Sequence, residues 1–300
     1  MHTARLDVRL TARIVRARPL EDPRTGVRAC AASGAILRDG RLFVVEDDSL
    51  SAAWIDPVTL SIERVPLLED GGRRAKADKA DFEAAFEAAD GAIWILGSGG
   101  TARRRRLVRF DPASGACAVL DASALYAALA AGLPVAPNVE GAVLVGDVVR
   151  LFHRANGTVG GASASFDVAF ADFCLGRGEV GPPSWFDLGG LARSGAGHGV
   201  VPLAFTDAAP LGDGRVLYLA AAEDSDDAIA DGPVLGAAVG IVEGEGARYA
   251  LLTEADGASS FRKVEGVAVV PGGARAWLVV DPDDTERASE LCEVVLEGPW

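Results

Sequence analysis

The sequence has few of the side chains that most often bind transition metals. Its 300 residues include only three histidines and four cysteines. None of them stands in a C-x-x-C or H-x-x-x-H arrangement, so a zinc site is disfavoured. The cysteines are far apart along the chain, which is typical of buried free thiols in a reducing compartment.

Basic residues and long apolar runs are also scarce. The chain has 29 Lys and Arg against 43 Asp and Glu, a net charge of −14. Nucleic acid is therefore disfavoured as a partner, because phosphate binding needs clustered basic side chains. The apolar stretch Leu125–Leu133 is far shorter than the ~20 residues that span a bilayer, and the first residues lack the apolar segment of a secretory signal. We expect a cytoplasmic protein with no membrane partner.

The most informative feature that is present is a short repeat. The tripeptide Val-Glu-Gly occurs at residues 139–141 and 264–266, and weaker copies begin at Phe82, Thr206 and Ala32. A turn glycine and a hydrophobic run follow each copy, which indicates a repeat architecture. The equivalent positions of the five units are assigned to Ser33, Glu83, Glu140, Asp207 and Glu265.

Short β-patterned runs, separated by Asp-Gly and Asp-Pro turns, fill each unit. In the first unit they cover residues 35–37, 41–46, 51–55 and 61–66. Four antiparallel strands per unit are typical of a β-propeller blade. The residues before Ser33 and after Glu265 together match one more repeat interval. We therefore expect N-terminal strands near residues 5–10 and 12–18 to complete the last blade.

The sequence thus predicts an all-β, five-bladed β-propeller in which residues 1–300 form a single domain and a monomer. Six blades are the alternative, and they would need a hidden unit within residues 157–199. One helix is expected at residues 124–131, capped by residues 121–123 and ended by Gly132.

Propeller geometry brings two sets of side chains to one rim of the central channel, because the first strand of each blade lines the channel and the second ends beside its start. The inner set contains the acids Glu83, Glu140, Asp207 and Glu265. The second set, from the ends of the second strands, contains Asp47, Glu223 and Asp281. Like charges at ~4 Å repel by about 4 kcal/mol at an effective dielectric near 20. We expect compensation from Lys79, Arg154 and Lys263, or from a bound cation.

Three roles stay open for these acids: capping of backbone groups between blades, binding of Ca²⁺, or direct catalysis. Carboxylates without His or Cys partners favour calcium or magnesium over zinc. Three other features are weaker candidates: Arg103–Arg106 as an anion clamp or a solvated loop, one of His153 and Arg154 facing the channel, and an acidic loop at 224–232 as a calcium loop.

Several motifs together resemble a group of bacterial propellers. They are the Glu-Gly unit starts, Leu96-Gly97-Ser98, Ala222-Glu223-Asp224, Lys263-Val264-Glu265-Gly266 and Val280-Asp281. The group is similar to the SdiA-regulated proteins and, more distantly, to the phytase-like or esterase-like propellers. The resemblance implies five blades and a calcium site, here through Glu83, Glu140, Asp207 and Glu265. The SdiA-regulated relatives are mostly exported, whereas this chain shows no export signal.

Two functions follow as hypotheses. The first is a metal-dependent hydrolase of an ester, lactone or phosphoester, with Ca²⁺ as the expected metal and Glu140 or Glu265 as metal ligand or general base. The second is a non-catalytic propeller that binds a small ligand or a protein on the same rim. A rim whose acids are fully paired by Lys79, Arg154 and Lys263 would favour the second.

Overall fold

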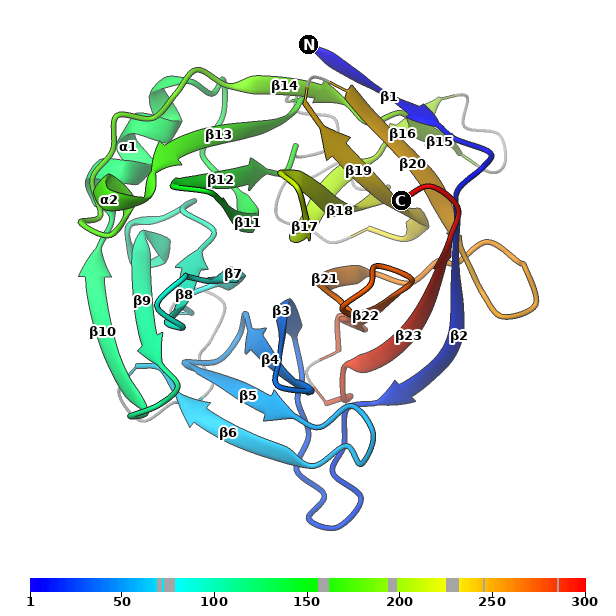
Figure 1. Cartoon of the computed structure of the whole chain (residues 1–300), viewed down its shortest axis with the longest axis horizontal. Coiled ribbons are helices and arrows are strands. Elements are labelled where there is room, and N and C mark those ends of the chain that lie inside the picture. The colour runs from blue at the N-terminus through cyan, green and yellow to red at the C-terminus, as the bar shows by residue number, and fades with distance from the viewer. Residues whose placement is uncertain are drawn as a thin grey trace.

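The computed structural model describes residues 1–68, 72, 79–155, 162–193, 199–224, 232–244, 246–284 and 286–300. Antiparallel sheets surround a central axis, as in a β-propeller (Figure 1). The helices are α1 (Ser123–Ala131), α2 (Phe170–Phe173) and the 3-10 turn η1 (Ala102–Arg104). Helices in the described residues are too short to cross a membrane. The nearly all-β propeller expected from the sequence is confirmed.

The first two units fold into separate four-stranded sheets, paired in chain order. Their strands are β3 (Ala32–Arg38), β4 (Arg41–Glu46), β5 (Ser51–Ile55), β6 (Ile62–Pro66), β7 (Phe82–Glu87), β8 (Ile93–Gly97), β9 (Arg106–Asp111) and β10 (Ala116–Asp121). Local turn chemistry explains their connections. Asp39 and Gly40 both have positive φ, 49° and 78°, which suits a tight hairpin. Asp56 Oδ1 accepts from the Val58 and Thr59 amides at 2.8 and 2.9 Å, closing the Asp-Pro turn.

The remaining units repeat the same order of pairing. Their strands are β11 (Val139–Val145), β12 (Val148–His153), β13 (Ser163–Ala169), β14 (Ser184–Asp187), β17 (Ala204–Gly212), β18 (Arg215–Glu223), β19 (Val234–Glu243), β20 (Gly246–Thr253), β21 (Val264–Val269), β22 (Arg275–Val280) and β23 (Glu290–Glu297). The N-terminal strand β2 (Thr11–Pro19) pairs antiparallel with β23. It supplies the fourth strand that the last unit lacks, as the sequence predicted.

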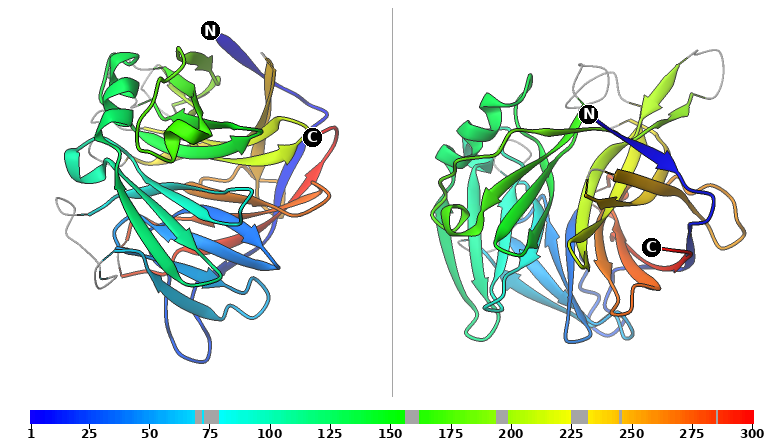
Figure 2. Two further views of the ribbon diagram at one scale, coloured as in Figure 1. Left: turned by 60° about the vertical axis from the view of Figure 1, so that its left-hand side comes forward. Right: turned by 45° about the horizontal axis from the view of Figure 1, so that its top comes forward.

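The first strand, β1 (His2–Leu6), departs from the expectation that it would join the last blade. It pairs in parallel with β14 and then with β20, so it crosses the outside of the ring between two units (Figure 2). Together with a short parallel pairing of β2 with β20, these bridges link three of the five sets into one 13-stranded sheet. The long third interval, where a sixth unit would lie, holds β13, α2 and β14 of the third unit. Beyond these, its described part adds only the two-stranded hairpin of β15 (Gly190–Ala192) and β16 (Val200–Pro202).

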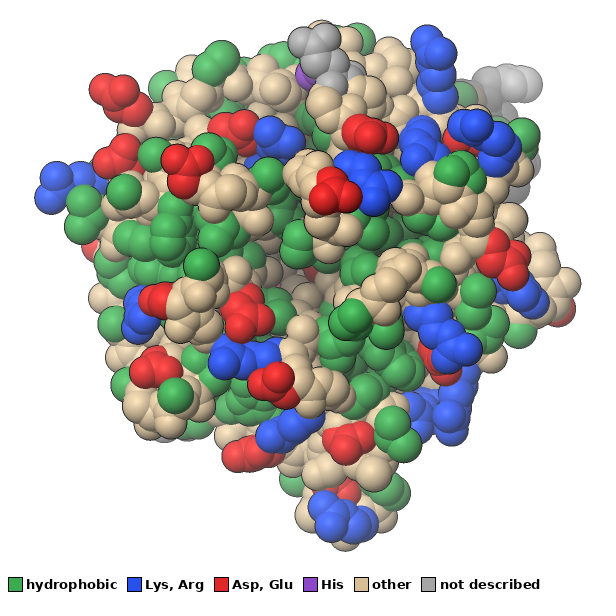
Figure 3. All heavy atoms as spheres, in the orientation of Figure 1, with side chains coloured by type: hydrophobic (Ala, Val, Ile, Leu, Met, Phe, Trp, Pro, Cys, Tyr) green, Lys and Arg blue, Asp and Glu red, His purple; other side chains and the backbone are tan. Residues whose placement is uncertain are grey.

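The glycine of the Val-Glu-Gly marker has a packing reason. A Cβ added at Gly266 would stand 2.1 Å from the Ser33 carbonyl oxygen on β3, and one added at Gly141 would stand 2.9 Å from the Ala208 nitrogen on β17. The innermost strands of neighbouring units therefore meet backbone to backbone, and only glycine permits that approach. Around the ring, acidic and basic side chains are interspersed on the face seen in Figure 3, which is hollowed at its centre.

Candidate functional site at the channel mouth

A β-bulge in each innermost strand places the marker residues. The pairing register skips one residue between Phe82 and Ala84, between Val139 and Gly141, and between Val264 and Gly266. A bulge re-aims the side chain of the extra residue. The bulged residues of these three strands are Glu83, Glu140 and Glu265, so the structure brings these predicted acids to equivalent places. In β3 the shift falls between Ala32 and Ala35, a span that contains Ser33 and Gly34.

The fourth unit corrects the alignment of the repeat. Its register shift lies between Phe205 and Asp207, so Thr206, and not Asp207, occupies the bulged position. Asp207 is almost fully buried and its Oδ2 accepts from the Val267 amide of β21 at 2.7 Å. Burial raises the pKa of Asp207 well above its usual value. This acid therefore ties β17 to β21, the capping role left open for the acids, and stands apart from the other three.

The ends of the second strands meet the starts of the first strands by one repeated hydrogen bond. The amides of Asp47, Ser98 and Arg154 each donate at 2.9 Å, and that of Asp281 at 3.1 Å, to the carbonyl two residues before the bulge of the same unit. The accepting residues are Ala31, Asp81, Asn138 and Lys263. The convergence of the two predicted sets on one rim is thus built into the backbone.

One side of the mouth is organised by Arg154; we call Glu140, Arg154, Glu223, Lys263 and Glu265 the arginine cluster. Arg154 Nη1 lies 3.6 Å from Glu140 Oε2 and 3.8 Å from Glu265 Oε1, and Nη2 donates to Glu223 Oε2. Lys263 Nζ lies 3.6 Å from Glu265 Oε1 and also pairs with Asp283. The side chains of Arg154, Glu140 and Glu265 are nearly buried, so these charges interact in a weakly screened environment.

Burial raises the pKa of both Glu140 and Glu265 to about 7, although Arg154 and Lys263 oppose the shift. The two carboxyl groups differ in their hydrogen bonds. Asn138 Nδ2 donates to Glu140 Oε1 at 2.6 Å. Among the described residues, Glu265 Oε2 on β21 is buried without a hydrogen-bond partner, as are Thr206 Oγ1 and Asp207 Oδ1 on the adjoining strand β17. Burial likewise raises the pKa of Asp281, at the end of β22, to about 6.

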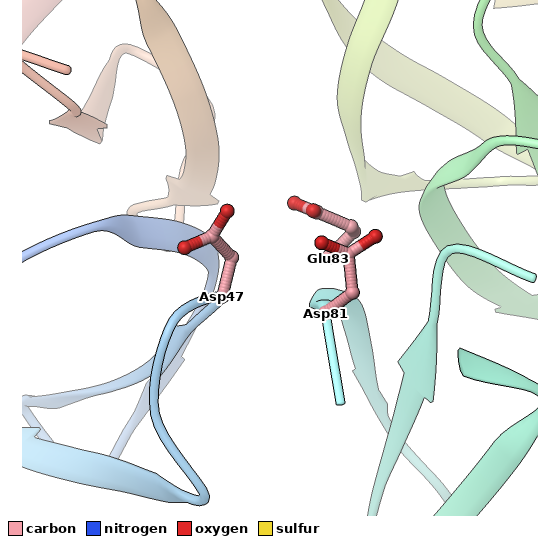
Figure 4. Close-up of side chains that lie close together, drawn as sticks. All are labelled: Asp47, Asp81 and Glu83. Carbon is pink, nitrogen blue, oxygen red and sulfur yellow. The ribbon is translucent and has the colours of Figure 1, made fainter. Parts of the chain in front are cut away.

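The other side of the mouth is organised by Lys79; we call Asp47, Lys79, Asp81, Glu83 and Arg104 the lysine cluster. Asp47 faces Asp81 and Glu83 across a gap (Figure 4), and one oxygen from each lies within 4.8 Å of the others. Lys79 Nζ lies 2.5 Å from Asp47 Oδ2 and 2.7 Å from Asp81 Oδ1. Arg104 Nη1 lies 2.7 Å from Asp81 Oδ2. Burial and the neighbouring acids raise the pKa of Glu83 well above its usual value.

The lysine cluster contains one residue that the sequence did not predict, Asp81. Asp81 has φ of 56°, a left-handed conformation that aspartate tolerates better than most residues. Its signal in the sequence was its place two residues before Glu83, the place that Lys263 holds before Glu265. Ser33 Oγ donates to Glu83 Oε2 at 2.5 Å. This contact shows that bulged side chains of adjacent innermost strands touch.

The carboxylates that the structure brings close together differ from the four acids predicted to bind a cation. Of Glu83, Glu140, Asp207 and Glu265, only Glu83 belongs to the compact carboxylate group of the described residues. The oxygens of Asp47, Asp81 and Glu83 are the hard donors that suit Ca²⁺. The ammonium of Lys79 lies between two of them. The negative charges of Glu140, Glu223 and Glu265 are instead compensated by the guanidinium of Arg154.

The structure also locates the three weaker candidates from the sequence analysis. Arg154 faces the mouth, whereas His153 is buried, its Nδ1 accepting from the Asn138 amide at 3.0 Å. Burial lowers the pKa of His153 to about 4, so it is neutral at pH 7. Within the arginine run, Arg104 belongs to the lysine cluster and Arg105 Nε donates to the Gly99 carbonyl at 3.2 Å. Residues 225–231 of the proposed calcium loop lie outside the described residues.

A family model matches residues 28–296, and it describes a family of unknown function, DUF6929. The chain belongs to this family. No curated protein matches the sequence. The resemblance to SdiA-regulated and phytase-like propellers stays a prediction.

Solved structures resemble the chain over nearly its whole length. The α-L-arabinofuranosidase PaAbf62A from Podospora anserina has a TM-score of 0.53 at 13% identity, covering 97% of each chain. The catalytic domain of the Coprinopsis cinerea GH62 α-L-arabinofuranosidase has a TM-score of 0.51 at 12% identity, covering 96% of each. Regucalcin from Agrobacterium tumefaciens, a calcium-binding protein, has a TM-score of 0.47 at 10% identity, covering 100% of this chain and 98% of that one. At such low sequence identity, structural similarity indicates a similar fold but not a shared function.

Proposed function

We propose that the chain is a hydrolase whose reaction takes place at the channel mouth, with Glu140 and Glu265 transferring the protons. The observation that carries the proposal is the pair itself. Two buried carboxyl groups, from innermost strands on either side of β17, approach the same guanidinium nitrogen of Arg154. Their pKa values of about 7 suit groups that exchange protons near neutral pH.

The two carboxyl groups lie close enough to act on one substrate. Glu140 Oε2 and Glu265 Oε1 are no further apart than the sum of their distances to Arg154 Nη1. Pairs of carboxyl groups within such a distance of each other cleave one bond together in glycoside hydrolysis. The two arabinofuranosidases of similar fold are hydrolases by name, which supports the reaction class without giving the substrate.

The charge of the mouth restricts the substrate. Its carboxyl groups are those of Asp47, Asp81, Glu83, Glu140, Glu223, Glu265, Asp281 and Asp283. Its basic groups are those of Lys79, Arg104, Arg154 and Lys263. Acids outnumber bases, so an anionic phosphoester is repelled, whereas a neutral ester, lactone or glycoside is not. Of the substrates considered from the sequence, the ester and the lactone fit best.

The proposal includes a cation that would bind at the lysine cluster. The carboxylates of Asp47, Asp81 and Glu83 would hold Ca²⁺, which polarises a substrate oxygen when bound. The ion would take the place of the Lys79 ammonium. A melting curve with EDTA and then with Ca²⁺ tests this step, and an unchanged midpoint in both would remove calcium from the account.

We also propose that the propeller has five blades. The five antiparallel four-stranded sets support this number. The third interval adds only two short strands in its described part.

The hydrolase proposal is tested with a panel of neutral and anionic substrates. It contains p-nitrophenyl acetate, alkyl acetates, γ- and δ-lactones, p-nitrophenyl α-L-arabinofuranoside and p-nitrophenyl phosphate. We expect turnover of at least one neutral member and none of the phosphate. The matched control is Glu63→Gln, which removes an acid from the exposed Arg41 pair and leaves turnover unchanged. No turnover of any neutral member would overturn the proposal.

A second function, ligand binding without catalysis, is favoured by one observation: Lys79, Arg154 and Lys263 all pair with acids of the mouth. Isothermal titration with L-arabinose and γ-butyrolactone separates the two functions. Saturable binding without turnover supports this one.

A further inference from the structure

The two proton-transferring acids have unequal surroundings. Glu140 Oε1 accepts the 2.6 Å hydrogen bond from the side-chain Nδ2 of Asn138, and the backbone N–H of Asn138 donates to Nδ1 of the buried His153 ring. A hydrogen bond donated to a carboxylate favours its ionised form. Glu265 is approached by Lys263 and Arg154 only at 3.6 and 3.8 Å, both at Oε1. Its Oε2 is buried and accepts no hydrogen bond from the described residues.

An ionised oxygen without a donor costs far more free energy inside a protein than a protonated one. When the pair holds a single proton, the Oε2 atom of Glu265 is therefore the favourable place for it. Other titratable groups near Glu265 are Asp281, Glu223 and, on the adjoining strand β17, Asp207. All three are acids, and where ionised they favour the neutral form of Glu265 as well.

Thr206 is a second buried polar residue, on the innermost strand next to that of Glu265. It holds the bulged position of β17, the innermost strand that packs between β11 and β21. Bulged side chains of adjacent strands reach each other, as the 2.5 Å contact of Ser33 with Glu83 shows. Thr206 is fully buried, and its Oγ1 has no hydrogen-bond partner among the described residues. Two unpartnered buried atoms on neighbouring strands indicate a place where a ligand supplies the missing partner.

We propose that Glu265 donates its proton to the leaving oxygen of the substrate, that the Thr206 hydroxyl orients this oxygen, and that Glu140, held by Asn138, accepts a proton from the attacking water. This assignment rests on the proposed hydrolase function. The water oxygen forms a bond to the substrate carbon while one water proton passes to Glu140. The bond from that carbon to the leaving oxygen breaks, and the oxygen keeps the electron pair and takes the Glu265 proton. The proton on Glu140 then returns to Glu265 through solvent, which restores the starting state.

The first test compares substrates with good and poor leaving groups. Departure of p-nitrophenolate needs little protonation, whereas departure of an alkoxide needs an acid. Glu265→Gln is expected to lower kcat/KM on an alkyl ester about 100-fold or more, and on p-nitrophenyl acetate much less. Glu140→Gln is expected to lower kcat/KM on both equally. Equal losses for both esters in Glu265→Gln, in an active wild-type protein, would overturn the assignment and leave the hydrolase function standing.

The Thr206 role is tested by a nearly isosteric change. Thr206→Val is expected to lower kcat/KM on the alkyl ester about tenfold, and Thr206→Ser to restore it. The matched control is Ser163→Ala, because Ser163 Oγ on β13 is also buried without a partner but lies outside the mouth. A similar loss in Ser163→Ala would assign the effect of Thr206 to packing.

A second measurement does not depend on turnover. Infrared spectra at pH 7 show the carbonyl band of a protonated carboxyl group. The difference spectrum of wild type against Glu265→Gln is expected to contain this band, and that against Glu140→Gln is expected to lack it. If no substrate is turned over, the hydrolase function fails while this spectrum still decides where the proton lies. A band lost only in Glu140→Gln would overturn the assignment.

Discussion

The buried acids of the mouth should make the protein less stable as the pH rises. Glu265 has a pKa of about 7 in the folded protein against 4.5 for the free group. Between these values the folded state holds a proton that the unfolded state has lost, so the free energy of unfolding falls as pH increases. The difference between the two pKa values corresponds to a loss of about 3 kcal/mol in the free energy of unfolding. This loss is complete above pH 7 and absent below pH 4.5. Glu140 acts in the same direction.

Replacing Glu265 by glutamine removes this penalty, because the amide stays neutral at every pH. At pH 8 the variant is expected to be more stable than wild type by up to about 3 kcal/mol, which is roughly 6 °C in melting temperature for a chain of this size. At pH 4.5 the two should melt together. Few substitutions of a nearly buried polar residue stabilise a protein, and those that do often mark functional sites.

The assay is thermal unfolding of both proteins by circular dichroism from pH 4.5 to pH 8. The control, Glu63→Gln, changes an exposed ion pair and should shift the midpoint little at any pH. The reasoning is refuted if Glu265→Gln is equally or less stable than wild type at pH 8, or if its effect is the same at both ends of the range.

Three further variants test other parts of the structure. Gly266→Ala should cost several kcal/mol or prevent folding, because the new Cβ meets the Ser33 carbonyl, whereas Gly199→Ala, with open space around it, should melt like wild type. Lys79→Met should increase the melting shift caused by Ca²⁺, since it frees Asp47 and Asp81; an unchanged shift would contradict a shared site. Asn138→Ala should move the acidic limb of the kcat/KM profile to higher pH, because Glu140 loses a hydrogen bond; an unmoved limb would assign Asn138 to packing alone.

Much of the fold follows from local sequence signals. The Asp-Gly and Asp-Pro turns, the β-patterned runs and the remainder at the two ends predicted the strand sets and the pairing of β2 with β23. Helix α1 begins where Asp121 accepts from the Ser123 amide at 2.9 Å and ends at Gly132. The place of β1 was not predictable, because its pairing with β14 and β20 joins segments more than 180 residues away.

The location of the site at the channel mouth was predictable from the sequence, but some of its residues were not. Aligning the repeat units by their acids made Asp207 equivalent to Glu140. The pairing register of β17 on β18 shows that Thr206 occupies the equivalent bulged position. That register depends on side-chain burial across two strands, which a repeat alignment does not see. Asp81 was missed because its role depends on a left-handed backbone and on Asp47 from the neighbouring unit. Both are tertiary features.

The most direct test of the account is the turnover of the best neutral panel substrate by wild type and by the double variant Glu140→Gln/Glu265→Gln. We expect kcat/KM of the double variant to fall by at least about 1,000-fold, while circular dichroism at pH 7 shows that it is folded. Turnover by a folded double variant at the wild-type rate would contradict the account, because the reaction would then not use the acids of the channel mouth.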